Sequence, residues 1–198
     1  SIAAEVGVDP ELARRAAELA KADLQSRMVN EFPELQGIAG RYYAAAAGES
    51  AEVAAAIDEV YMPRFAGDAI APSRLGQVLA IAERLDTLAG GFAAGLKPTG
   101  NKDPFSLRRN ALGLARTVIE GSNNIDTHDE ILSALKSSDI AIQKISNQRI
   151  EAAADSAAEL GIKTISLLPG TAHGNGDLRG VELYDFVLDR LRAYYADQ

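Results

Sequence analysis

The stretch APSRLGQVLAIAERLDTLAGGFA (residues 71–93) carries the clearest helix signal in the sequence. Leu75, Leu79, Ala82, Ala89 and Ala93 recur at helical spacing, which makes one face of the predicted helix apolar. A helix with such a face is stable in water only when that face packs against other elements. The stretch therefore predicts a long helix with one face buried in a helical core.

Asp86 lies within this apolar stripe. An unpaired buried carboxylate is costly, so we expect a structural ion pair, with Arg108 or Arg41 as its partner. The alternative is a metal ligand of an all-helical phosphohydrolase. Such sites also use histidine, and His128 and His173 fall in polar segments that we expect to be exposed. We therefore predict a structural role for Asp86, and neither a catalytic residue nor a metal site.

Helical patterns continue on both sides of this stretch. Asp9 before Pro10 and Asp103 before Pro104 are typical helix starts, because the carboxylate caps the first turn and proline suits its first position. The predicted helical segments are residues 9–29, 33–48, 49–63, 103–121, 127–161 and 181–198. Residues 162–168 are compatible with one short strand or an irregular segment. The sequence thus predicts an all-α fold of seven or eight helices.

Composition narrows the class of protein. The 198 residues contain 47% hydrophobic side chains, no cysteine and a net charge of -8. No apolar run is long enough to span a membrane, and the absence of cysteine suits the cytoplasm. The start without Met indicates a piece of a longer protein. The negative charge argues against a surface that attracts nucleic acid everywhere, but it leaves room for a local basic patch.

Basic residues cluster in and just after the stretch GLKPTGNKDPFSLRR (residues 95–109). Its two glycines resemble a phosphate loop, but Asp103 stands where that motif needs a hydroxyl, and no strand precedes the loop. On the following helix Arg108 lies nearer the apolar side, so we expect it to pair with a buried carboxylate. The candidates for a solvent-facing RNA-binding patch are Lys97, Lys102, Arg109 and Arg116.

Three phrases of the sequence go beyond composition. They are MVNEFPELQGIAGRYYA (28–44), YMPRFAGDAIAP (61–72) with LAIAERLDTLAGGFAAGLKPTGNKDPFSLRRNALGLARTVIE (79–120), and ELYDFVLDRLRAYYADQ (182–198). Together they closely resemble the β subunit of the bacterial heterotetrameric glycine–tRNA ligase. The resemblance is nearly continuous over the first 120 residues and returns near residue 181.

The resemblance implies an HD-like helical domain whose metal ligands are degenerate. Its core would be residues 1–121, followed by a variable segment (122–180) and a closing helix (181–198) that leads toward an absent anticodon-binding domain. In this family the α subunit activates glycine with ATP, and the β subunit supplies much of the tRNA binding. The expected partners are therefore tRNA(Gly) and the α subunit in an α2β2 assembly.

The resemblance also implies that the fragment itself needs no cofactor, whereas the complete enzyme uses ATP and Mg²⁺. The leading hypothesis is a tRNA-interacting domain that supports glycylation of tRNA(Gly). Two alternatives stay open: a structural module between domains or subunits without RNA contact, and an active metal phosphohydrolase.

Overall fold

A computed structural model describes residues 2–121, 123, 130, 133–134, 137, 182–183, 185–190 and 192–193. Its helices are α1 (Ile2–Val6), α2 (Pro10–Leu19), η1 (Ala22–Gln25), α3 (Arg27–Glu31), η2 (Pro33–Leu35), α4 (Ile38–Ala46), α5 (Ala51–Glu59), α6 (Arg74–Ala93) and α7 (Leu107–Glu120). Further helical residues lie between positions 182 and 193. Among the described residues there is no strand, so the predicted all-α class is confirmed; the HD-like arrangement remains a prediction.

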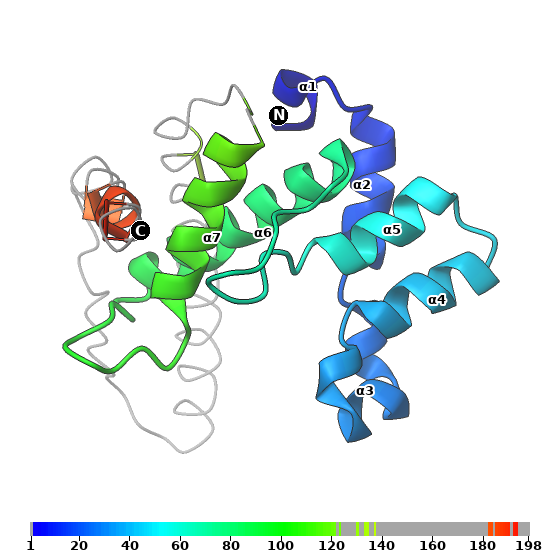
Figure 1. Ribbon diagram of the computed structural model, residues 1–198, viewed down its shortest axis with the longest axis horizontal. Helices are drawn as coiled ribbons and strands as arrows, with labels where there is room; N and C mark the ends of the chain where they lie inside the picture. Colours follow the sequence, from blue (N-terminus) through cyan, green and yellow to red (C-terminus); the bar gives the residue numbers. More distant parts are fainter. Residues whose placement is uncertain are drawn as a thin grey trace, which may run out of the picture.

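Helix α6 is the centre of the fold (Figure 1). Its first half packs Leu75, Val78 and Leu79 into a cluster with α1, α2, α4 and α5. Its second half packs Leu88 and Phe92 into another cluster with α7. A helix that is buried on several sides needs apolar residues around most of its circumference, and α6 has them. The predicted long helix is thus confirmed over Arg74–Ala93, and it is more deeply buried than one apolar stripe implies.

The helical residues after position 181 pack beside α7, on the side away from α5 (Figure 1). Leu183 and Val187 are buried in the same cluster as α7. The rings of Phe92 and Phe186 lie 5.4 Å apart. Leu183, Phe186 and Val187 therefore add to the hydrophobic core at α6 and α7.

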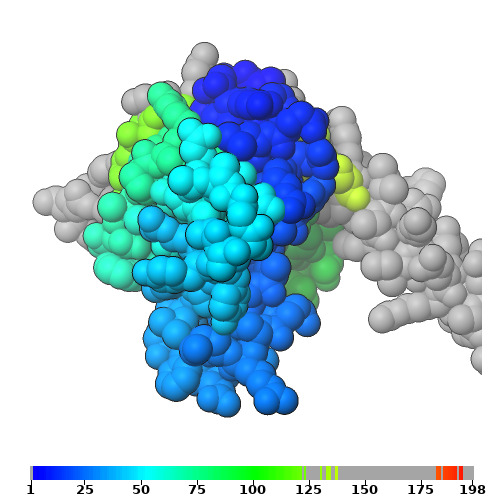
Figure 2. All heavy atoms as spheres, turned by 90° about the vertical axis from the view of Figure 1, so that its right-hand side faces the viewer, coloured from blue at the N-terminus to red at the C-terminus, as the bar shows by residue number. Residues whose placement is uncertain are grey.

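Two predicted helices are divided in the structure. Residues 9–29 do not form one helix, because α2 ends at Leu19 and Lys21 adopts a left-handed conformation with φ of 64°. Residues 33–48 are divided at Gly37, whose φ of 82° favours glycine and lets α4 begin afresh at Ile38. As a result α3 and η2 project from the body of the domain (Figure 2).

Some predictions fall outside the described residues. These are the short strand at 162–168, His128, His173 and most of the variable segment 122–180. The described helices include none that is long and apolar enough to cross a membrane.

Candidate functional site

The loop before α7 is held by its own backbone and by one carboxylate. Thr99 and Lys102 exchange two backbone hydrogen bonds of 3.1 and 2.9 Å. The side chain of Asp103 accepts hydrogen bonds from the backbone N–H groups of Leu107 at 2.8 Å and Arg108 at 2.9 Å. Asp103 therefore caps the helix as predicted. The predicted start at Pro104 is wrong, because the helix begins at Leu107 and Asp103 reaches it across the intervening turn.

This cap also removes one candidate anion site. A free helix N-terminus attracts phosphate through its unpaired N–H groups. Here the carboxylate of Asp103 already occupies two of those groups and brings a negative charge beside them. Any phosphate near this loop must therefore be bound by side chains.

The four predicted RNA-binding residues separate into two groups. Lys102 and Arg109 are exposed, and neither side chain forms an ion pair among the described residues. Lys97 instead pairs with Glu182 and lies 5.5 Å from the centre of the Phe92 ring. Arg116 is only 5% exposed, so its placement on the solvent-facing patch was wrong.

Arg116 is buried because a loop from far upstream covers it. Its guanidinium pairs with Glu120 on the same helix at 2.6 Å and donates to the backbone carbonyl of Ala66 at 3.1 Å. Ala66 lies fifty residues earlier in the chain, between α5 and α6. The helical spacing of Arg109 and Arg116 gives no sign of this loop.

A groove of about 550 Å³ lies between that loop and α7. Five arginines line it: Arg64, Arg108, Arg109, Arg116 and Arg190. The loop adds Pro63, Phe65 and Ala66, and α7 adds Leu112 and Gly113. No carboxylate is among the described residues that line it. We call this hollow the arginine groove.

The charge of the arginine groove is only partly balanced. Arg64 pairs with Asp58, and Arg116 pairs with Glu120. The guanidinium of Arg108 donates to the carbonyl of Gly100 at 2.6 Å, which is a neutral acceptor. Arg109 and Arg190 have no carboxylate partner within the described part of the chain. Three positive charges therefore face the groove in a chain of net charge -8.

Arg190 contributes an unusual feature to this groove. Its Nε is buried and has no hydrogen-bond partner, while its guanidinium lies 5.7 Å from the centre of the Phe186 ring. Buried N–H groups are normally paired, because leaving one unpaired costs about 1–3 kcal/mol. This unpaired Nε lies in the interior, beneath the part of the Arg190 side chain that lines the groove.

Arg84 is one of three buried charges among the described residues, with Asp23 and Glu59, that the sequence analysis did not consider. It is 4% exposed and donates to the backbone carbonyls of Val60, Tyr61 and Pro63 at 3.3 Å, and of Ala80 at 3.0 Å. Burial lowers the pKa of its guanidinium from the ordinary value, and the nearby charge of Glu83 partly opposes that shift. Arg84 therefore fixes the end of α5 and the loop that begins there.

The predicted buried charges lie elsewhere. Asp86 is exposed on α6, so its assignment to a buried ion pair was wrong. Arg41 is also exposed, and its nearest carboxylate is Asp58 at 3.8 Å. Arg108 is half-buried as expected, but its guanidinium bonds to a backbone carbonyl instead of a carboxylate.

A second hollow of about 430 Å³ adjoins the arginine groove and shares Arg64 and Arg109 with it. Glu34 and Glu83 also line this second hollow, so its charge is mixed. Burial, with the charges of Asp23 and Glu83, raises the pKa of Tyr61 on its wall to about 12. Because two carboxylates line this hollow, it suits an anion less well than the arginine groove does.

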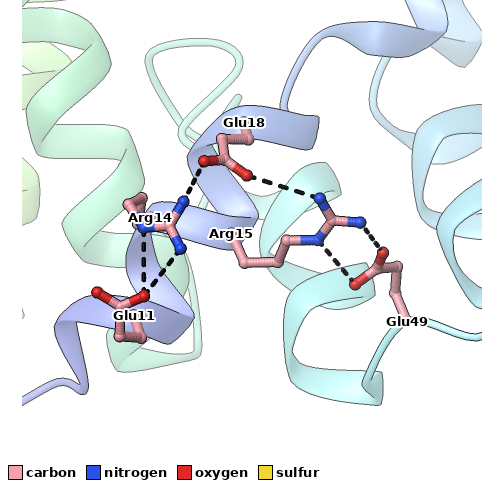
Figure 3. A network of polar contacts seen from close by, with 5 residues as sticks. All are labelled: Glu11, Arg14, Arg15, Glu18 and Glu49. Atoms are coloured by element: carbon pink, nitrogen blue, oxygen red, sulfur yellow. Dashed lines mark hydrogen bonds and ion pairs between the residues drawn. The ribbon is translucent and has the colours of Figure 1, made fainter.

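Several arginines elsewhere are neutralised, as Figure 3 shows for Arg14 and Arg15 of α2. Arg14 pairs with Glu11 at 2.8 Å and with Glu18. Arg15 pairs with Glu49 and approaches Glu18 to 3.6 Å. This network contains two guanidinium groups and three carboxylates. The surplus of positive charge in the arginine groove is thus not a general property of the surface.

The described residues contain no group of three or more His, Asp or Glu side chains that could hold a metal ion.

Comparison with known proteins assigns the chain to a class. The family model described as glycyl-tRNA synthetase beta subunit matches residues 1–198. The chain therefore belongs to the glycyl-tRNA synthetase β subunit family.

Curated relatives agree with this assignment. The glycine–tRNA ligase β subunit of Xanthomonas campestris pv. campestris (strain B100) is 60% identical over 198 residues, which are all of this chain and 25% of that protein. The one from Xylella fastidiosa (strain M12) is 55% identical over 201 residues, covering 100% of this chain and 27% of that protein. The chain thus spans about a quarter of the length of these relatives.

Proposed function

We propose that this chain is the RNA-contacting helical domain of a glycine–tRNA ligase β subunit. The observation that carries the proposal is the pair Lys102 and Arg109, which are exposed and unneutralised among the described residues. Arg109 lines the arginine groove, and Lys102 lies in the loop before α7, in a chain whose family is named for glycyl-tRNA synthesis. Basic side chains of this kind bind the phosphates of a nucleic acid without reading its sequence.

The complete ligase would divide the reaction between its subunits. Glycine activation with ATP and Mg²⁺ would take place on the α subunit, in an α2β2 assembly in the cytoplasm. The domain would help to hold tRNA(Gly) for the transfer of glycine. Lys97 has a smaller part in this proposal than the sequence analysis gave it, because Glu182 already neutralises it.

The test reverses charges in the complete α–β ligase. We expect Lys102→Glu and Arg109→Glu together to lower the affinity for tRNA(Gly) about tenfold or more at 0.1 M salt, because phosphate contacts dominate such binding. Glycine-dependent exchange of pyrophosphate into ATP should not change, since neither residue would touch the activation site. Arg27→Glu on α3 is the control, because Arg27 is also exposed and has no ion pair among the described residues.

An unchanged tRNA affinity in the double variant would rule out this function.

A structural module is the second candidate function, and exposed apolar side chains favour it. Leu24, Met28, Phe32, Ile38, Tyr42 and Tyr43 are all exposed between η1 and α4. Apolar side chains that gather on a surface are typical of protein contacts. Weaker association of the α and β subunits in variants of these residues, with normal tRNA affinity throughout, would favour the structural role.

A further inference from the structure

We propose that the arginine groove binds an unpaired nucleotide of the RNA, with its phosphate at the arginines and its base against Phe65. This inference rests on the proposed function and adds to it the kind of RNA segment that is bound. Three features of the groove support it: its charge, the aromatic ring that lines it, and the hydrogen bonds of the loop that presents that ring.

The positive charge of the arginine groove favours a phosphate group as the ligand. Arg108, Arg109 and Arg190 face the groove without a carboxylate partner among the described residues. The Arg190 side chain lines the groove, with its guanidinium 5.7 Å from the centre of the Phe186 ring. Guanidinium groups bind phosphate oxygens through paired N–H donors, which a lysine cannot do. The neighbouring hollow has two glutamates on its wall, so the phosphate belongs in the arginine groove.

The ring of Phe65 selects an unpaired base. Phe65 lines the same groove and is 63% exposed, which is high for a large aromatic side chain. An aromatic ring beside basic groups is the usual arrangement for holding single-stranded RNA, because a base that is not in a duplex can stack on the ring. A duplex offers only its backbone to such a groove and would leave Phe65 unused.

The loop that presents Phe65 is held from both sides. Arg84 donates to the carbonyl of Pro63, and Arg116 donates to the carbonyl of Ala66. The backbone N–H of Arg64 donates to Asp68 at 2.7 Å. These bonds fix the backbone on both sides of Phe65, so the ring is presented from a defined point of the loop. Such preorganisation reduces the entropy that binding must overcome.

The test uses the complete α–β ligase and measures binding of tRNA(Gly) at several salt concentrations. We expect Arg190→Gln to weaken binding severalfold and to reduce the slope of log K against log salt by about 0.7, which is the loss of one phosphate contact on a single strand. Arg192→Gln is the matched control, because Arg192 is exposed two residues away and pairs with Asp189. It should leave both quantities unchanged.

Variants of Phe65 test the base contact separately. We expect Phe65→Leu to weaken tRNA binding about fivefold or more with no change in salt slope, because stacking involves no counterion. Phe65→Trp keeps an aromatic ring and should restore binding. A short single-stranded RNA should compete for the groove, whereas an RNA duplex and pyrophosphate should compete poorly.

Three results would overturn the inference. One is normal tRNA binding in both the Arg190→Gln and the Phe65→Leu variants. If Lys102→Glu still weakens tRNA binding in that case, the proposed function stands without this site. Another is strong competition by pyrophosphate, which would assign the groove to a free phosphate compound. The last is a loss of α–β association in Phe65→Leu with unchanged RNA affinity, which would make the ring a protein contact.

Discussion

At the scale of single residues, the buried charges are where sequence and structure differ most. Helical spacing predicted a buried Asp86, but Arg84 is buried instead, and the two positions lie on different sides of α6. Alanine caused the error, because Ala82 and Ala93 were counted with the apolar face and alanine is common on either face. Residue spacing alone also cannot show that four backbone carbonyls accept hydrogen bonds from the Arg84 guanidinium.

Gly113 on α7 gives a test of this buried arginine. A Cβ at Gly113 would lie 2.5 Å from the Nε of Arg84, whose side chain cannot move without losing its carbonyl partners. We expect Gly113→Ala to lower the free energy of unfolding by about 1–3 kcal/mol, measured by denaturant titration.

Gly90→Ala on α6 is the control for that measurement. A Cβ at Gly90 would meet nothing within 4 Å, so the change should raise stability by about 0.5–1 kcal/mol through helix propensity. If Gly113→Ala were as stable as Gly90→Ala, the tight contact with Arg84 would not exist in solution.

At the scale of elements, the sequence predicted which segments are helical better than where each one begins. The starts of α2 at Pro10 and of α7 near Asp103 carry clear capping signals, and both carboxylates do cap their helices. The start of α7 is nevertheless three residues late, because Asp103 acts across the turn at Pro104–Ser106 and Ser106 adopts a left-handed conformation. A local pattern identifies the capping residue but does not give the path of the chain between cap and helix.

The cap of α7 gives a prediction at this scale. Asp103→Ala would leave the N–H groups of Leu107 and Arg108 without their acceptor. We expect it to cost about 0.5–2 kcal/mol of stability, seen as a lower midpoint in thermal or denaturant unfolding. Asp103→Asn keeps one side-chain oxygen and should lose less. Equal stability of Asp103→Ala and the unchanged protein would contradict the capping role.

At the scale of the whole molecule, the candidate site could be predicted only in part. The loop at residues 95–109 was identified from its basic residues, and Lys102 and Arg109 are indeed exposed. The rest of the arginine groove joins Phe65, α7 and Arg190, which are far apart in the sequence and meet only because α6 and α7 pack together. Long-range packing also explains why Arg116 is covered while Arg109 remains accessible.

The most direct test of RNA contact is a backbone footprint of tRNA(Gly) on the complete α–β ligase. Hydroxyl-radical cleavage would be compared between the unchanged ligase and the Lys102→Glu, Arg109→Glu variant, at protein concentrations that saturate the RNA in both cases. The account predicts a short run of riboses that is protected by the unchanged ligase and exposed in the variant, with the other protections retained. Identical footprints for the two proteins would contradict it.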